Sequence, residues 1–225
     1  MKALVTGASG YVGGRLVPRL LEQGFEVSVI VRDAHRLDDV PWRSQVTVFV
    51  GDLRDEEAVA KAVAGQDIVY YLVHSMSHAD DFASVEREIA HVVARQAAKH
   101  NVSRIVYLGG LHPAGPLSKH LASRKEVGEV LLASGVPTIV LRAGVIIGSG
   151  SASFEMIRHL TEVLPYMPAP KWVRNFIQPI AIRDVLHYLI KAAMIDPSIN
   201  RGFDIGGPDV FRYGQLMNGY ALEAG

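Results

Sequence analysis

Short apolar runs alternate with segments of helical periodicity along the first two thirds of the chain. Such alternation is typical of β-α-β units, which build a parallel sheet covered by helices. The pattern predicts strands at residues 2–6, 26–31, 46–51, 68–72, 104–108 and 138–141, and helices at residues 11–23, 56–64, 84–100 and 118–134. The expected fold is therefore a Rossmann-type, doubly wound α/β fold with a mainly parallel sheet.

After Gly150 the pattern loosens, although further helices and strands are still expected over residues 154–164, 176–182, 184–195 and 203–205. Residues 165–170 contain three prolines and exclude regular structure there. We therefore predict a core at residues 1–150 and a smaller, substrate-side lobe at residues 151–225. The last helical segment stops abruptly at Gly225, so we expect the natural protein to continue into a further domain.

Composition and charge narrow the function classes. Lys plus Arg and Asp plus Glu both number 23, and no basic run is present, so nothing favours nucleic-acid binding. The absence of cysteine excludes disulfides, thiolate catalysis and cysteine metal sites. No apolar stretch approaches the roughly 20 residues of a membrane span. The first strand begins almost at once and leaves no room for a signal peptide, so a cytoplasmic location is expected.

A glycine loop lies between the first strand and the first helix, in the segment Thr6-Gly-Ala-Ser-Gly-Tyr-Val-Gly13. A pyrophosphate can approach a backbone only where no side chain blocks it, and the amides that open a helix favour an anion. The glycine spacing differs from the usual Gly-x-Gly-x-x-Gly. The residues predicted to contact a dinucleotide here are Gly7, Ser9, Gly10, Tyr11, Val12 and Gly13.

The loop and four later motifs resemble the extended and atypical short-chain dehydrogenase/reductases. The later motifs are Gly51-Asp52-Leu53, Arg142-Ala-Gly-Val-Ile-Ile-Gly148, Gln178-Pro-Ile-Ala-Ile-Arg-Asp184 and Phe203-Asp-Ile-Gly-Gly-Pro208. The chain most resembles the NmrA-like, NAD(P)H-binding branch, often called nucleoside-diphosphate-sugar epimerases. Tyr71-Leu-Val-His-Ser-Met76 and Ser123-Arg-x-Glu-Val-Gly-Glu129 resemble one subgroup, whose members often carry a further C-terminal domain.

The residues Val31 and Arg32, at the end of the second strand, indicate which dinucleotide is bound. Enzymes that select NAD usually place an acid at this strand end, whereas Val31 and Arg32 stand here. Guanidinium pairs well with phosphate, so Arg32, with Arg36 as a second contact, favours NADP over NAD. The alternative is that Arg32 is a solvated charge at a strand end, and Asp33 weakens a purely positive site.

The resemblance implies further cofactor contacts after the third and fourth strands. Asp52 and Leu53 would face the adenine, although Asp52 could instead cap the helix that follows. Leu72 and His74 would lie beside the second ribose. His74 and His78 also stand four residues apart, but without a clear third ligand we predict no metal site.

The residues that normally perform the chemistry are replaced. Members of the resembled family use a serine together with Tyr-x-x-x-Lys, whereas Gly109 and Gly110 end the fifth strand here. Ungapped alignment of the next helix puts His120 at the tyrosine place and Arg124 at the lysine place. Residues four apart share a helix face, so both could face a cofactor. Arginine could hold the ribose but could not transfer a proton, whereas histidine could do so.

Residues of the second lobe are weaker candidates. Phe154, Met156 and Met167 could line a substrate pocket or simply fill a core. Trp172 and Arg174 are better substrate-side candidates because a proline-ended loop presents them. Asp184 is expected to cap the helix that follows it.

Two functions fit these observations. The first is an NADP(H)-dependent oxidoreductase or epimerase-like enzyme that acts on a small molecule through His120 and Arg124. The second is a non-catalytic dinucleotide-binding sensor, regulator or assembly protein. The sequence leaves the oligomeric state open, a homodimer included.

Overall fold

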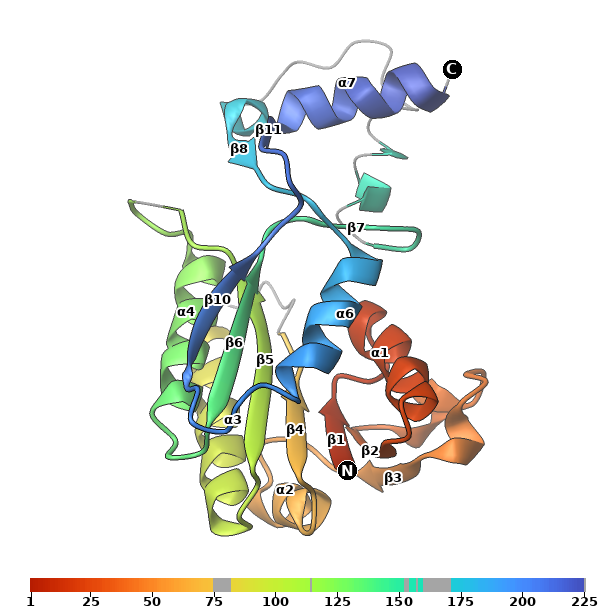
Figure 1. The fold of residues 1–225 in the computed structure, drawn as a ribbon, viewed down its shortest axis with the longest axis vertical. Coiled ribbons are helices and arrows are strands. Elements are labelled where there is room, and N and C mark those ends of the chain that lie inside the picture. The colour runs from red at the N-terminus through yellow and green to blue at the C-terminus, as the bar shows by residue number, and fades with distance from the viewer. Residues whose placement is uncertain (75–81, 114, 152–153, 157, 160–170, 225) are drawn as a thin grey trace. The chain divides into compact units, whose positions relative to one another are not determined.

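The computed structural model of the chain describes residues 1–74, 82–113, 115–151, 154–156, 158–159 and 171–224 (Figure 1). Contacts divide the chain into two compact units, Met1–Arg142 with Leu186–Phe203 and Ala143–Val185 with Asp204–Gly225. The contacts place Leu186–Phe203 in the first unit, whereas the sequence analysis grouped those residues with the second lobe. Within the described residues, no helix combines the length and the apolar character that crossing a bilayer requires.

A seven-stranded sheet in the order β10-β6-β5-β4-β1-β2-β3 forms the centre of the first unit. The pairs β1–β2, β1–β4, β2–β3 and β4–β5 are parallel. The strands are β1 (Lys2–Thr6), β2 (Glu26–Val31), β3 (Thr47–Val50), β4 (Ile68–Tyr71), β5 (Arg104–Gly110), β6 (Thr138–Ala143) and β10 (Arg201–Ile205). The predicted Rossmann-type fold is confirmed.

The helices of this fold are α1 (Tyr11–Glu22), α2 (Glu56–Val63), α3 (Phe82–Lys99), α4 (Lys119–Leu132) and α6 (Ile182–Ala192), with the 3-10 turns η1 (Ala34–Leu37) and η2 (Arg43–Gln45). Figure 1 shows α2, α3 and α4 together on one face of the sheet, with α1 on the other. The predicted helix ends are close to those observed. Gly24, Gly65 and Gly135 all have positive φ just beyond a helix, as a closing glycine requires.

The main hydrophobic core lies between the sheet and α2, α3 and α4. Its members come from both layers and include Leu4, Val69, Ile105 and Tyr107 from the strands and Val59, Val93, Ala97, Val127 and Leu131 from the helices. The residues of α3 that face the sheet have two roles. Val92, Val93 and Ala97 are buried in the core, Val85 lines a cavity, and Ile89 lines the same cavity and also packs against the core.

The segment between α6 and β10 is fastened to the first unit by polar contacts. The buried Arg104 side chain donates from Nη2 to the Asp196 carbonyl at 2.9 Å. Asn200 accepts from the Thr138 amide at 2.9 Å and donates to the Leu132 carbonyl at 3.1 Å. These bonds connect residues more than 60 positions apart in the sequence and explain why the segment belongs to this unit.

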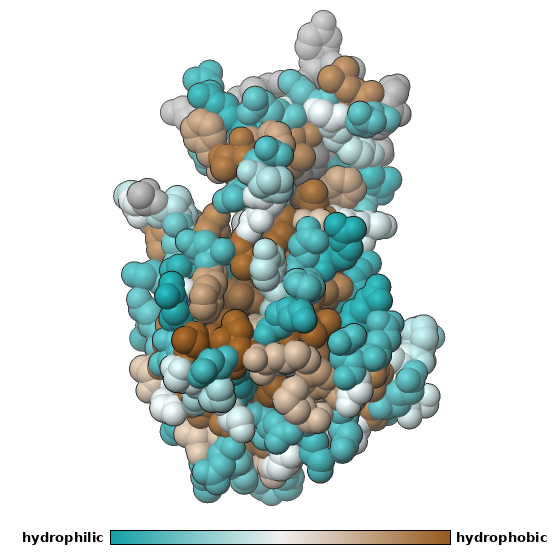
Figure 2. Space-filling view, viewed as in Figure 1, coloured by the Kyte–Doolittle hydropathy of each residue, from teal (hydrophilic) through white to brown (hydrophobic). Residues whose placement is uncertain are grey.

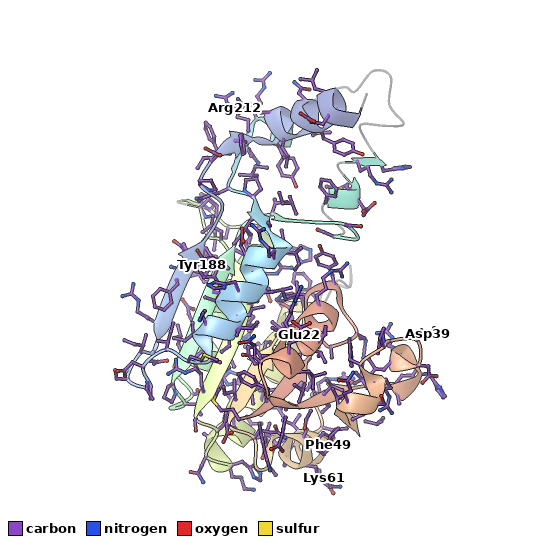
Figure 3. All side chains as sticks on the ribbon, turned by 45° about the vertical axis from the view of Figure 1, so that its right-hand side comes forward. Glu22, Asp39, Phe49, Lys61, Tyr188 and Arg212 are labelled. Atoms are coloured by element: carbon purple, nitrogen blue, oxygen red, sulfur yellow. The ribbon has the colours of Figure 1, made fainter. Side chains whose placement is uncertain are left out.

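The second unit contains two small sheets, in which β7 (Ile146–Ile147) pairs with β9 (Ile180–Ala181) and β8 (Phe176–Ile177) pairs with β11 (Phe211–Arg212). Among the described residues, this unit also contains η3 (Lys171–Arg174), α7 (Tyr213–Ala224) and helical backbone at residues 154–156 and 158–159. Two of the sequence motifs meet here, because the Gln178 amide donates to the Gly207 carbonyl at 2.8 Å. Arg212 extends from β11 (Figure 3), with its guanidinium 5.1 Å from the centre of the Phe176 ring.

The predicted cap at Asp184 is wrong. The helix α6 begins at Ile182, so Asp184 lies inside its first turn rather than before it, and its carboxylate contacts Arg183. An acid in that turn still interacts favourably with the helix dipole. Met167 and residues 160–170 lie outside the described residues, as does the Trp172 side chain. Arg174 is exposed and Phe154 packs edge-to-face against Tyr220.

Candidate functional site

A cavity of about 570 Å³ opens at the carboxyl ends of β1, β2, β3 and β4 in the first unit. Because β4 pairs with β1 on the side opposite β2, the strand order reverses here, and ligands of open α/β sheets bind at such a point. The volume is within the range of small-molecule and cofactor sites. The predicted contact residues among those lining it are Gly7, Ser9, Gly10, Arg32, Arg36, Asp52, Leu53, Leu72 and His74.

The glycine loop is shaped by close approaches of its own backbone. A Cβ atom at Gly13 would lie 2.3 Å from the Gly7 carbonyl oxygen, and one at Gly7 would lie 2.8 Å from the Leu72 oxygen. The Gly7 carbonyl accepts from the Gly10 amide at 3.0 Å, which closes the turn into α1. Glycine at positions 7 and 13 is therefore required by the turn itself, and the exposed Gly10 begins α1 without a side-chain cap.

Thr6 connects this loop to β4. The Thr6 hydroxyl is fully buried, donates to the Tyr70 carbonyl at 3.2 Å and accepts from the Leu72 amide at 3.1 Å. These two bonds fix the end of β4 against the loop. Leu72 and His74 thereby reach the cavity wall, whereas Tyr11, Val12 and Gly13 continue into α1 and are not part of that wall.

His74 is held in its neutral form. Burial and, to a smaller extent, the positive charge of Arg124 lower the pKa of His74 from its ordinary 6.5 to about 3, against a hydrogen bond to the Leu108 backbone. The imidazole is therefore uncharged at neutral pH and can offer one donor and one acceptor. His78, the second histidine of the spacing noted in the sequence, lies outside the described residues.

Three arginines line the opposite end of the cavity. Arg32 follows β2, Arg36 lies in η1, and Arg54 follows β3. Sequence reasoning missed Arg54, although its place two residues after Asp52 was visible. The cap proposed for Asp52 is wrong, because Asp55 is the N-cap of α2 and accepts from the amides of Glu57 and Ala58. Asp52 instead binds Arg54 through both carboxylate oxygens.

Glu86 is a second cavity residue that sequence reasoning missed. Its side chain is buried on α3, lines the cavity and accepts a hydrogen bond from the Ser123 hydroxyl on α4. The available signal was an acid between Val85 and Ile89, on the otherwise apolar face of the helix. Burying a carboxylate is costly unless it is well hydrogen-bonded, so the Ser123 contact is part of what makes this position possible.

The end of β5 has no side chain where the resembled family carries serine. A Cβ atom at Gly110 would lie 2.7 Å from Leu121 Cδ2 and 3.8 Å from Arg124 Nη1, so these two side chains occupy that space. The neighbouring Gly109 accommodates the ring of Tyr107, whose hydroxyl donates to the Arg124 carbonyl at 3.1 Å. Burial raises the pKa of the Tyr107 phenol. Tyr107, which is buried on β5, therefore does not take the place of the tyrosine in the Tyr-x-x-x-Lys motif.

His120 and Arg124 lie one turn apart on α4, as the alignment predicted, in different surroundings. His120 is exposed, and its ring stacks on Phe82 of α3 with the ring centres 4.4 Å apart. Arg124 is half-buried, and its aliphatic chain covers Gly110. Neither side chain is among those lining the cavity. The structure thus brings Arg124 to the end of β5, while His120 contacts α3.

A second depression of the first unit, of about 860 Å³, lies over α3 and α4 and is lined by residues that include His91, Arg95, Glu126 and Glu129. Figure 2 shows hydrophilic and hydrophobic residues side by side over the visible face. The exposed large hydrophobic side chains of this unit include Val50, Tyr188 and Met194. Single exposed apolar residues of this kind are normal on globular proteins.

The chain is similar in sequence to proteins of bacteria and of mitochondria. An uncharacterised protein of Mycobacterium tuberculosis is 28% identical over 202 residues, which is 90% of this chain and 21% of that protein. Subunit 9 of the mitochondrial NADH dehydrogenase 1 alpha subcomplex of Mus musculus is 24% identical over 217 residues, 92% of this chain and 57% of that subunit. The chain therefore spans a fifth to three fifths of the length of these relatives.

Solved structures show the same fold. The enzyme WbmG of Bordetella bronchiseptica, in complex with NAD, superposes with a TM-score of 0.83 at 18% identity, covering 100% of this chain and 78% of that one. The family model described as NAD(P)H-binding matches residues 7–147, from the glycine loop to β7. The chain is thus a member of the NAD(P)H-binding family.

Proposed function

We propose that the cavity binds NADP(H) in preference to NAD(H). The observation that carries this proposal is the state of Arg32 and Arg36, which line the cavity and, among the described residues, have neither a side-chain hydrogen bond nor an ion pair. The nearby Asp33 carboxylate accepts from the His35 amide at 3.0 Å and so caps η1. Two unpaired guanidinium groups at the end of β2 suit a phosphate on the adenine ribose.

Calorimetric titration with NADP⁺, NAD⁺ and their reduced forms tests this proposal. We expect at least about tenfold tighter binding of the phosphorylated cofactors, which is the effect of one good charge-assisted contact. Arg32→Ala should remove most of that preference. Arg19→Ala, which breaks an exposed ion pair with Glu22 away from the cavity, should leave it unchanged. Equal affinity for both cofactors in the unsubstituted chain would refute the preference.

We further propose that the chain is an oxidoreductase or epimerase-like enzyme in which His120 and Arg124 replace the tyrosine and lysine. The support is the position of Arg124 beside Gly110, together with the influence of its charge on His74 and Tyr107. Arg124 would hold the ribose near the ends of β4 and β5. The exposed His120 would transfer a proton to or from substrate oxygen, while the bound cofactor supplies or accepts the hydride.

Cofactor oxidation with a panel of carbonyl and quinone substrates tests this chemistry. His120→Ala should lower turnover at least about 100-fold, the usual contribution of a positioned acid or base. Lys125→Ala, a substitution on the outer face of the same helix, is the control and should have little effect. Turnover that survives His120→Ala unchanged would exclude His120 as the proton carrier.

A second candidate function is that of a dinucleotide-binding sensor, regulator or assembly protein without turnover. Leu121 supports it, because its side chain fills the space that a serine at position 110 would need. The similarity to a subunit named for the mitochondrial NADH dehydrogenase 1 alpha subcomplex, over 92% of this chain, points the same way. This candidate predicts tight cofactor binding, no turnover across the substrate panel, and no effect of His120→Ala on affinity.

A further inference from the structure

Asp52 and Arg54 both line the cavity and form an ion pair, called the clamp below. Asp52 Oδ1 accepts from the Arg54 amide at 2.9 Å and from Arg54 Nε at 3.1 Å. Asp52 Oδ2 accepts from Arg54 Nη2 at 3.2 Å. A bidentate pair with an additional backbone bond fixes the plane of the guanidinium more firmly than a single contact would.

The electrostatics of the clamp favour its charged form. The hydrogen bond from the Arg54 side chain holds the pKa of Asp52 below its ordinary value, and the charge of Arg32 adds a smaller effect in the same direction. Arg32 therefore lies within electrostatic reach of the clamp, although it does not bind to it. The carboxylate neutralises about one of three positive charges, and the cavity end remains cationic.

The sheet order places this cationic end away from the glycine loop. The loop follows β1, Arg32 follows β2, and Arg54 follows β3, which is the edge strand beyond β2. Since the family resemblance puts the adenine beside the end of β3, a pyrophosphate held by the loop amides would have the adenosine half of the dinucleotide directed toward Arg32 and Arg54. The anion expected beside these arginines is one carried by the adenosine half, which in a dinucleotide is the 2′-phosphate.

We propose that Arg54 is a specificity residue for the 2′-phosphate of NADP(H), and that Asp52 is the positioning residue that orients it. The inference rests on the proposed preference for NADP(H), and it gives Asp52 a role other than the adenine contact that the family resemblance implies. An arginine fixed before binding loses less side-chain entropy when it meets the phosphate. The clamp thus prepares a third guanidinium beside Arg32 and Arg36.

Four probes test the clamp by calorimetry: NADP⁺, NAD⁺, 2′,5′-ADP and AMP. Arg54→Met keeps much of the side-chain volume and should weaken NADP⁺ and 2′,5′-ADP about tenfold, with NAD⁺ and AMP within about twofold of the unsubstituted chain. Asp52→Asn should weaken the same two phosphorylated probes by a smaller factor and leave the other two unchanged. Arg19→Met, at an exposed arginine paired with Glu22, is the matched control.

Binding of NAD⁺ reports in each variant that the cavity is still folded. If Asp52→Asn weakens NAD⁺ and NADP⁺ equally, Asp52 contacts a part common to both cofactors, and the positioning role is refuted. If Arg32→Ala removes the preference while Arg54→Met leaves it intact, the inference on Arg54 fails and the proposed function stands. If the unsubstituted chain shows no preference for NADP⁺, the proposed function itself fails.

Discussion

In the first unit, the segments that follow β1 and end β5 are held in place by different kinds of contact. At the end of β1, backbone atoms approach one another so closely that positions 7 and 13 admit no side chain. At the end of β5, Gly110 also lacks a side chain, but flexible ends of Leu121 and Arg124 fill the space beside it. The first end is fixed by main-chain geometry. The second can be rearranged by side-chain movement, so chemistry there can change while the fold persists.

Gly13→Ala should have the largest effect. Its Cβ would lie 2.3 Å from a carbonyl oxygen that cannot move without opening the turn, so we expect a loss of at least about 3 kcal/mol in the free energy of unfolding, together with loss of cofactor binding. Urea denaturation measures the first effect and calorimetry the second. Gly24→Ala is the control, since nothing lies within 4 Å there and only its positive φ costs, about 1 kcal/mol. Equal losses in the two variants would contradict the distinction between the two ends.

Gly110→Ser should have an intermediate effect. The new side chain meets the end of a leucine rather than backbone, so we expect a cost of about 1–2 kcal/mol and no gain of turnover. Adding Leu121→Ala should relieve the contact. A double-mutant cycle by urea denaturation should therefore give a favourable coupling of about 1 kcal/mol. Additive effects of the two substitutions would mean that Leu121 does not fill the space at Gly110.

The pH dependence of stability should depend on His74, with an effect that is spread over several pH units. The pKa of His74 is lowered in the folded protein to about 3 from 6.5, so between these values only the unfolded state takes up this proton. Stability from this group is complete above pH 6.5 and falls as the pH falls toward about 3, by at most about 1.4 kcal/mol per pH unit. Urea midpoints between pH 7.5 and 4.5 should fall less in His74→Asn than in the unsubstituted chain.

An exposed histidine supplies the control for that measurement. The hydrogen bond to Asp38 raises the pKa of His35, so its contribution has the opposite sign and is lost as the pH rises through the raised value. His35→Asn should therefore not reduce the fall in stability at acid pH. If His74→Asn and the unsubstituted chain lose stability in parallel, His74 titrates normally in the folded protein.

The sequence was sufficient for the fold because its signals are local. Apolar runs predicted β1 and β2 with their observed bounds, and the predicted end of α1 at residue 23 is one residue from the observed end at Glu22. The ends of β5 and β6 extend two residues further than predicted. These extensions contain glycine and arginine, which are not typical strand residues, so pairing with neighbouring strands determines them rather than propensity.

The site was less predictable because it depends on contacts between distant residues. The sequence does not show that Asp52 binds Arg54 rather than capping α2, because either arrangement would give the carboxylate of an aspartate before a helix its hydrogen bonds. Glu86 and Ser123 are 37 positions apart, and only the packing of α3 on α4 brings them together. His120 likewise shares a helix face with Arg124, yet its ring stacks on Phe82 from another helix.

The chain passes between its two units three times, at residues 142/143, 185/186 and 203/204. A single nick by a protease at the first of these passages would leave two fragments, yet the first unit needs both. Leu186–Phe203 belongs to the later fragment and is fastened to the earlier one through Arg104 and Thr138. Nicked protein should therefore remain one particle on gel filtration, and grafting a foreign second unit onto this core requires three junctions instead of one.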